Sequence, residues 1–313
     1  MKILVTDNNQ ALVESLTAYG HECVVMTDCT YDTLMECVGG YEALVVRSKI
    51  NIDRHFIDHA RNLRCIGRVG AGMETIDVEY AESCGIRCLN SPEGNRDAVG
   101  EHAVGLLLAM ADKIAMADRE VREGLWRREA NRGFEIKGRT VGIIGCGNMG
   151  AAFAQRLRGF ECEIIAYDKY KPAGYAPGGV EEVTLAELQR RAEIVSLHVP
   201  LTEETRYMVD AAFINAFARP FYLINTSRGG VVRTSALAEA MKSGRVLGAA
   251  LDVVEYEDMS KDSLDKETLT PDFRYLIESP RTVLTPHVAG WTVESRRKLG
   301  TVLADKINSL IIT

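Results

Sequence analysis

The chain has 313 residues, of which 46% are hydrophobic and 26% are charged, which is the composition of a globular protein with enough length for two domains. Its net charge of -7 argues against a general attraction to nucleic acid or anionic lipid, so small metabolites are the expected partners. The eight cysteines form no CxxC pair and show no Cys/His spacing typical of zinc, so we expect reduced thiols and no metal.

The N-terminal residues predict no export signal and no membrane anchor. Met1–Asp7 runs directly into a strand pattern and lacks the basic and apolar regions of a signal peptide. The longest apolar run, Ala103–Ala111, is far shorter than the roughly 20 residues that cross a bilayer. We therefore expect a cytoplasmic protein that does not contact membranes.

Short apolar runs alternate with amphipathic segments over the first third of the chain. This alternation is typical of buried parallel strands connected by helices. The runs are Ile3–Val5, Cys23–Met26, Ala43–Val46, Cys65–Val69 and Ile86–Leu89.

A long helix is predicted next. Residues 92–95 interrupt the strand pattern, and the stretch from Asp97 to Val121 contains no proline and is followed by Gly124. We expect one continuous helix over about residues 97–123. Its apolar residues cover more than one face, which implies burial on several sides, and packing between subunits is one way to supply it.

A second alternating series predicts a separate α/β domain. After it, Thr282–Leu284 predicts a strand and about 292–311 a final amphipathic helix, and we expect both to pack against the first domain. The polar segment Glu257–Arg274 has no clear period and is interpreted as a surface excursion without an assigned function. The strands of the series are predicted at Thr140–Ile144, Glu163–Tyr167, Ile194–Val199, Phe221–Asn225 and Val246–Leu251.

A glycine-rich turn of the form GxGxxG follows the first strand of this series. Gly145 permits a tight turn, Gly147 lets a pyrophosphate approach the backbone amides, and Gly150 allows close packing of the following helix. The N-terminus of that helix offers N–H groups and partial positive charge to the pyrophosphate. A turn required only for packing is the alternative interpretation.

Asp168 ends the next predicted strand, 18 residues beyond Gly150. A carboxylate at this position can accept hydrogen bonds from the adenosine ribose hydroxyls, and it would repel a 2′-phosphate. The cofactor predicted from this pair of features is NAD rather than NADP.

Three later strand ends carry side chains suited to acid–base chemistry. Arg228 can hold a carboxylate by two hydrogen bonds at the sheet edge where open α/β folds bind ligands. His287 can take a hydroxyl proton while hydride leaves C2 of the substrate for the nicotinamide, and Glu257 can hold the imidazole tautomer. The alternatives are a solvated arginine, an ordinary surface acid and a histidine beside a turn proline.

The segments Gly-Cys-Gly-Asn-Met-Gly, Asn-Thr-Ser-Arg-Gly-Gly, Ala-Leu-Asp-Val and Thr-Pro-His-Val-Ala-Gly, in this order, resemble the D-isomer-specific 2-hydroxyacid dehydrogenases over essentially the whole chain. Within that family, Val46–Ser48, Val69–Gly72 and Gly94–Glu101 look most like the phosphoglycerate dehydrogenases.

The resemblance implies an α/β fold with two doubly wound parallel-sheet domains. Residues 1–94 and 283–313 would form a flavodoxin-like substrate domain, and a Rossmann NAD-binding domain at 95–282 would be inserted in it. A homodimer would form largely through the long helix at about 97–123.

The resemblance also implies roles for individual residues. Arg228 would orient the substrate, His287 would be the acid/base, and Glu257 would pair with His287. Substrate contacts would come from Arg47, which would meet a substrate phosphate, and from Ser48, Gly70, Ala71, Arg228 and His287. NAD contacts would come from Gly145, Gly147, Asn148, Met149, Gly150, Asp168, Val199, Pro200, Thr226, Ser227, Arg228, Asp252, His287, Ala289, Gly290 and Ala71.

The expected reaction is the NAD-dependent oxidation of 3-phospho-D-glycerate to 3-phosphohydroxypyruvate in serine biosynthesis. A reductase of hydroxypyruvate, glyoxylate or another small 2-keto acid is the alternative enzyme, and an NAD-sensing scaffold resembling corepressors is a more distant one. Met73–Asp77 departs from the family's usual Val-Asp-Asn-Ile-Asp, and Glu255 adds a second acid beside Glu257. Because the chain stops at Thr313, we expect none of the serine-binding regulation of longer relatives.

Overall fold

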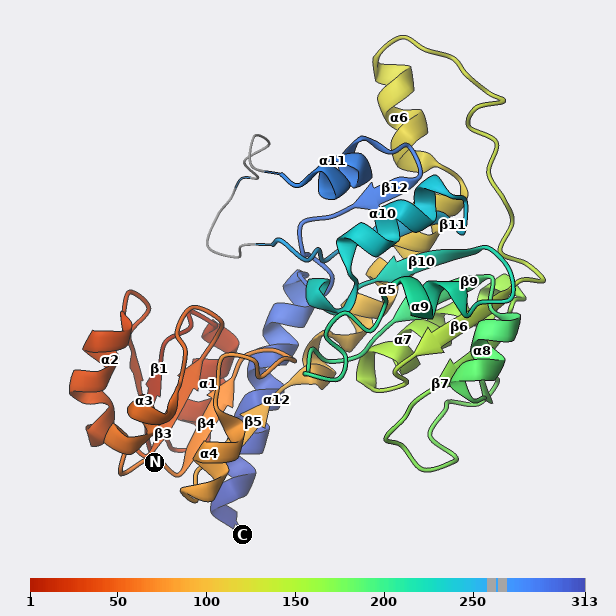
Figure 1. The fold of residues 1–313 in the computed structure, drawn as a ribbon. Helices are drawn as coiled ribbons and strands as arrows, with labels where there is room; N and C mark the ends of the chain where they lie inside the picture. Colours follow the sequence, from red (N-terminus) through yellow and green to blue (C-terminus); the bar gives the residue numbers. More distant parts are fainter. Residues whose placement is uncertain (258–262, 264–268, 313) are drawn as a thin grey trace. The chain divides into compact units, whose positions relative to one another are not determined.

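The computed structural model describes residues 1–257, 263 and 269–312 (Figure 1). The chain forms two compact units, one of Met1–Ala98 with Gly290–Thr313 and one of Val99–Ala289. Each is built on its own parallel sheet, which confirms the predicted fold class. This division lies a few residues from the predicted domain boundaries at 94/95 and 282/283.

In the described part of the first unit, five parallel strands lie in the order β2-β1-β3-β4-β5. The order reverses beside β1, and the carboxyl ends of the strands at such a switch point are where open α/β sheets bind ligands. β3 is fully buried and apolar, and residues 3–5 of β1 and 65–67 of β4 are buried beside it, as burial on both faces requires. The strands are β1 (Lys2–Val5), β2 (Glu22–Val25), β3 (Ala43–Val46), β4 (Cys65–Arg68) and β5 (Arg87–Asn90).

Helices cover both faces of this sheet. One hydrophobic cluster joins it to α2, α3 and α4, and another joins it to α1 and α12. A Cβ on Gly300 would lie 2.5 Å from Asn9 Oδ1, so glycine is what lets α12 approach α1. The final helix thus packs in the first unit, as predicted. These helices are α1 (Gln10–Ala18), α2 (Tyr31–Cys37), η1 (Val38–Gly40), α3 (Arg54–His59), α4 (Val78–Ser83) and α12 (Val293–Ile312).

In the described part of the second unit, seven parallel strands lie in the order β12-β11-β10-β9-β6-β7-β8. The order reverses between β6 and β9, which is the switch point at which a Rossmann sheet binds its dinucleotide. The strands are β6 (Thr140–Ile144), β7 (Glu163–Tyr167), β8 (Glu181–Glu182), β9 (Ile194–Leu197), β10 (Phe221–Asn225), β11 (Val246–Leu251) and β12 (Thr282–Leu284).

Helices also cover both faces of this second sheet. The cluster that includes Leu188, Leu237 and Phe273 joins the sheet to α8, α9, α10 and α11, and the cluster around Phe153 joins it to α5 and α7. These helices are α5 (Pro92–Ala111), α6 (Ile114–Arg122), α7 (Asn148–Leu157), η2 (Arg158–Phe160), α8 (Leu185–Arg191), α9 (Ala211–Asn215), η3 (Gly229–Val231), α10 (Thr234–Lys242) and α11 (Pro271–Glu278).

The prediction of one continuous helix over 97–123 is wrong. The segment forms α5 and α6, separated at Lys113, whose φ of 53° is left-handed. The returning chain causes the break, because Phe134 N donates to Ala111 O and takes a carbonyl that the helix would otherwise use. The helix also begins earlier than predicted, since Pro92 is accepted at a first helical position.

Two further expectations differ from the structure. Thr282–Leu284 pairs with β11 and belongs to the second sheet, not to the first domain, because a three-residue apolar run does not encode its partner strand. The predicted excursion Glu257–Arg274 overlaps α11, whose start is capped by Thr270 Oγ1 accepting from Phe273 N. Its residues 258–262 and 264–268 lie outside the described residues. No helix in the described part is long and apolar enough to span a membrane.

Candidate active site

The glycine-rich turn joins β6 to α7 at the switch point of the second sheet. Gly145 has a φ of +87°, and a Cβ there would lie 2.6 Å from His198 O. A Cβ on Gly150 would lie 2.1 Å from Gly145 O, so the helix packs directly against the turn. Gly147 has open space where its Cβ would be and offers no side chain to cap α7. An uncapped helix N-terminus with room above it fits a pyrophosphate.

Asp168 is held beside this turn after β7. Its Oδ2 accepts a hydrogen bond from Cys146 N at 3.0 Å, and its Oδ1 accepts one from Tyr170 N at 3.1 Å. Lys171 Nζ donates to Cys146 O at 2.8 Å from the same loop. The carboxylate is therefore fixed next to the pyrophosphate turn, where an adenosine ribose would follow.

His198, after β9, lies under the turn as a neutral residue. Its Nε2 hydrogen bonds with Ser196 Oγ at 2.8 Å, and its Nδ1 is buried. Burial lowers the pKa of His198 from 6.5 to about 3. A neutral imidazole adds no charge to the cofactor crevice.

The loop after β10 presents Arg228. Asn225 is fully buried; its Oδ1 accepts from Ser227 N and Oγ at 3.0 and 2.7 Å, and its Nδ2 donates to Arg228 O at 3.0 Å. A Cβ on Gly229 would lie 1.9 Å from Val254 O, so only glycine fits there. The role of Asn225 was not predicted, although a polar residue in an otherwise apolar strand was a signal for it.

Thr226 in the same loop fits a cofactor contact. Its Oγ1 is buried and has no hydrogen-bond partner in the described residues. Buried hydroxyls normally have a hydrogen-bond partner. The amide group of a bound nicotinamide would supply one for Thr226 Oγ1. Val199 and Pro200 follow β9 on the neighbouring strand.

The structure brings His287 and Glu257 together. His287 Nδ1 lies 3.1 Å from Glu257 Oε2, and both side chains are about one-quarter exposed, at 28% and 25%. Glu257 N donates to Val254 O, the atom against which Gly229 also packs, so the segment that carries Arg228 meets the one that carries Glu257. With Nδ1 directed at a carboxylate, Nε2 is the nitrogen left to exchange a proton.

A buried carboxylate fixes the loop that carries the histidine. Asp252 is 1% exposed and accepts hydrogen bonds from Thr285 Oγ1 at 2.6 Å, Val288 N at 2.9 Å and Ala289 N at 2.8 Å. His102 Nε2 of α5 lies 3.3 Å from Asp252 Oδ1 and 3.0 Å from Thr285 Oγ1. These five residues form what we call the Asp252 cluster.

The Asp252 cluster keeps the carboxylate of Asp252 charged and holds His287 in place. Burial by itself would raise the pKa of Asp252, but hydrogen bonds from His102, Thr285 and the two amides hold that pKa below its ordinary value. His287 N also donates to Asp252 O at 2.8 Å, which helps to hold His287 at a left-handed φ of 52°. His102 and Thr285 were not predicted as site residues. A histidine directly before the apolar run of the helix was the available signal.

Glu255, the additional acid noted in the sequence, has a structural role. Its Oε2 accepts from Thr234 N at 2.8 Å and so caps the start of α10. Burial opposes this ionisation, yet the bonds from Thr234 and Tyr207 lower the pKa of Glu255. Of the two neighbouring acids, Glu255 therefore caps a helix and Glu257 pairs with His287.

Asn148 and Met149 begin α7 in the second unit, and the remaining predicted residues lie in the first unit. Arg47 and Ser48 follow β3, and Gly70 and Ala71 follow the adjacent β4. Ala71 O accepts from Asn90 Nδ2 at 2.7 Å, which ties this loop to the end of β5. Gly290 is also part of this unit.

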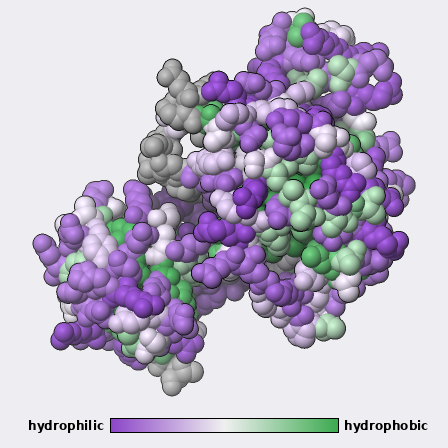
Figure 2. Space-filling view, viewed as in Figure 1, coloured by the Kyte–Doolittle hydropathy of each residue, from purple (hydrophilic) through white to green (hydrophobic). Residues whose placement is uncertain are grey.

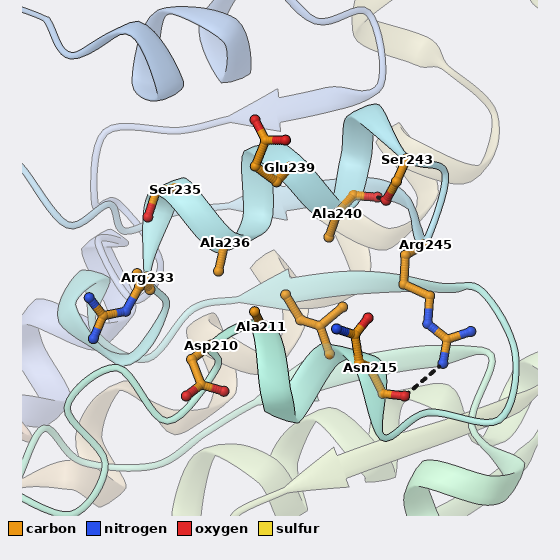
Figure 3. Close-up of a pocket in the computed structure, with 11 residues that line it drawn as sticks. Asp210, Ala211, Asn215, Arg233, Ser235, Ala236, Glu239, Ala240, Ser243 and Arg245 are labelled. Carbon is orange, nitrogen blue, oxygen red and sulfur yellow. Dashed lines mark hydrogen bonds between the residues drawn. The ribbon is translucent and has the colours of Figure 1, made fainter.

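A separate hollow lies between α9 and α10, and Figure 3 shows charged side chains from both sides of it. Asp210, Arg233, Glu239 and Arg245 are among its lining residues, and Arg245 donates to Asn215 O at 3.2 Å. The described residues that line it include none of the predicted site residues. We assign it no part in the reaction.

Residues 104–289 match the model of the NAD binding domain of D-isomer specific 2-hydroxyacid dehydrogenases. The chain belongs to this family. The second unit is accordingly its nicotinamide-dinucleotide-binding domain. Over 309 residues the chain is 36% identical to the D-3-phosphoglycerate dehydrogenase of Archaeoglobus fulgidus, covering 98% of this chain and 56% of that one.

Other proteins similar to this chain carry different names. Over 276 residues the chain is 39% identical to the hydroxypyruvate reductase of Thermotoga maritima, covering 88% of this chain and 87% of that one. Among solved structures, an acyclic imino acid reductase in complex with NADPH and D-Arg aligns with a TM-score of 0.85 and 26% identity, covering 100% of this chain and 97% of that one. The chain thus spans little more than half of the phosphoglycerate dehydrogenase and most of the hydroxypyruvate reductase.

Proposed function

We propose that this family member oxidises 3-phospho-D-glycerate to 3-phosphohydroxypyruvate with NAD, as in serine biosynthesis. The observation that carries the dehydrogenase proposal is the His287–Glu257 pair, with Nδ1 and Oε2 3.1 Å apart. The phosphorylated substrate is supported by Arg47 at the carboxyl end of β3 and by the similarity to the phosphoglycerate dehydrogenase of A. fulgidus.

In this proposal the protein residues orient the substrate and move one proton. Arg228 holds the C1 carboxylate with its planar guanidinium. His287 Nε2 takes the proton of the C2 hydroxyl, and Glu257 stabilises the imidazolium that forms. Bound NAD supplies the acceptor for the hydride that leaves C2. In the reverse direction His287 returns the proton to the carbonyl oxygen.

The preference for NAD over NADP is supported by the position of Asp168. Its carboxylate is fixed beside the glycine turn by Cys146 N and Tyr170 N. A 2′-phosphate would meet this negative charge, whereas ribose hydroxyls would donate to it. Amides at the start of α7, from Asn148 and Met149, would bind the pyrophosphate.

Hydroxypyruvate reduction is the second candidate, favoured by the T. maritima relative because that similarity covers most of both chains. Initial rates of NADH oxidation with 3-phosphohydroxypyruvate, hydroxypyruvate, glyoxylate and pyruvate test the choice. A higher kcat/KM for the phosphorylated acid supports our proposal. Equal or better rates with hydroxypyruvate would replace it with the second candidate, and no turnover with any of them would favour an NAD-sensing scaffold.

We also infer that the protein is a homodimer. α6 carries Ile114 and Val121, each 52% exposed, and Figure 2 shows hydrophobic residues among polar ones on the projecting part that Figure 1 labels α6. Apolar side chains on a projecting helix suit a contact with a second copy. Sedimentation equilibrium should give twice the chain mass of 34.5 kDa. A single-chain mass would refute the dimer.

We also propose a cytoplasmic location, because the eight free cysteines suit a reducing compartment.

A further inference from the structure

The switch point of the first sheet carries an arginine that two neighbours contact. Asp7 follows β1 and Arg47 follows β3, the two strands beside which the strand order reverses. Arg47 Nη1 lies 3.5 Å from Asp7 Oδ2, and the side chain of Asp7 is only 5% exposed. A buried aspartate thus fixes one end of the guanidinium at a position where open α/β sheets bind ligands.

An aromatic ring contacts the same guanidinium. Arg47 Cζ lies 4.5 Å from the ring centroid of Trp291, and Trp291 is 66% exposed. A tryptophan side chain is large and apolar and is rarely so accessible. Cation–π attraction to the ring holds the guanidinium, and its forked N–H groups remain suited to bonding an anionic ligand. We call Asp7, Arg47 and Trp291 the Arg47 stack.

The local sequence holds the exposed ring in place. Gly290, with a φ of +89°, turns the chain just before Trp291. Thr292 and Ser295 then form a reciprocal cap at the start of α12, in which each backbone N–H donates to the other side chain at 3.0 Å. Ser295 Oγ also donates to Gly290 O. Trp291 is therefore pinned between a turn and a helix cap, so its exposure does not reflect a loose end.

We propose that Trp291 is a specificity-determining residue, which holds Arg47 ready to bind an anionic group at C3 of the substrate. The inference rests on the proposed function and names the substrate class that it favours: 2-hydroxy and 2-keto acids with a phosphoryl group at C3. An arginine already oriented by Asp7 and Trp291 loses less conformational freedom on binding than a mobile one. With an uncharged C3 hydroxyl this advantage disappears, because no charge meets the guanidinium.

A binding experiment tests the Arg47 stack without turnover. The chain has two tryptophans, so Trp126→Phe leaves Trp291 as the fluorescent reporter. We expect 3-phosphoglycerate to change its emission saturably without NAD, D-glycerate to change it little, and Arg47→Ala to abolish the response. Equal responses to both acids, or a response that persists without Arg47, would overturn the proposal.

A kinetic experiment tests whether Trp291 sets the preference for the phosphorylated substrate. The kcat/KM for 3-phosphohydroxypyruvate divided by that for hydroxypyruvate should fall about tenfold in Trp291→Ala, mainly through KM, and should be retained in Trp291→Phe, which keeps a stacking ring. Val293→Ala, which removes an 85% exposed apolar side chain two residues away, is the matched control and should leave the ratio unchanged.

The outcomes separate this inference from the proposed function. An unchanged ratio in Trp291→Ala, with the parent enzyme active, refutes the role of Trp291 and leaves the dehydrogenase standing. A phosphate-selective fluorescence response in a protein that turns over none of these acids supports the Arg47 stack and refutes the proposed activity.

Discussion

The carboxyl edges of the two sheets hold their polar groups in different ways. In the second unit the central carboxylate is buried and satisfied several times over: Asp252 is 1% exposed and accepts hydrogen bonds from two amides and a hydroxyl. In the first unit Arg47 is held at the surface by a single ion pair of 3.5 Å and an exposed ring. The buried network around Asp252 is rigid, and altering it costs stability. The surface contacts of Arg47 can be changed with one substitution. We infer that the second unit carries the chemistry and the first unit chooses the substrate.

The largest effect is expected at the acid/base of the second unit. His287→Gln keeps a polar side chain but cannot transfer the proton, so kcat should fall by about 10³-fold while NAD affinity stays nearly unchanged. Initial rates give kcat, and calorimetric titration gives the NAD affinity. Retention of more than a tenth of the activity would show that another group moves the proton.

The Asp252 cluster should matter next, through position rather than contact with substrate. His102→Ala removes a hydrogen bond to the buried carboxylate, and we expect kcat to fall about tenfold with KM little changed, because the loop that carries His287 loses a constraint. His102→Gln should recover part of the loss. His55→Ala, which changes an exposed histidine of α3, is the control and should match the parent. A fall in kcat of the same size in His55→Ala would show that the loss in His102→Ala does not come from the Asp252 cluster.

Cofactor choice should change when the ribose carboxylate is removed. Asp168→Ser removes the charge that would repel a 2′-phosphate, so the ratio of kcat/KM for NAD to that for NADP should fall about tenfold or more. Steady-state rates with each cofactor at fixed substrate measure it. An unaltered ratio would place the discrimination elsewhere in the crevice.

The smallest effect concerns acid stability of the second unit. Because folding lowers the pKa of His198 from 6.5 to about 3, the unfolded chain binds the extra proton. Its stabilising contribution is complete above pH 6.5 and is lost as the pH falls from about 6.5 toward 3, by at most about 1.4 kcal/mol per pH unit. Urea unfolding at pH 7.5, 6 and 5 should show a weaker pH dependence in His198→Gln. Identical dependences would mean that His198 protonates equally in both states.

Strand ends were predictable from the sequence because parallel strands alternate with helices and carry their functional residues at one edge. That pattern predicted Arg228, Glu257 and His287 at neighbouring strand ends, and the structure brings Glu257 and His287 within 3.1 Å. The contact between Asp252 and His102 was not predictable, since the two residues lie 150 positions apart on different elements, although His102 itself stands out before an apolar run. The same holds for the break at Lys113, which depends on the returning residue Phe134. Local periodicity does not encode such contacts.

The division of labour between the two units is tested most directly by measuring kcat/KM of Arg47→Ala with 3-phosphohydroxypyruvate and with hydroxypyruvate. We predict a loss of about 10²-fold for the phosphorylated acid, because a charge-assisted bidentate contact disappears, and a change of less than about twofold for hydroxypyruvate. Equal losses with both acids would contradict the claim, because they would make Arg47 part of the chemistry rather than of substrate choice.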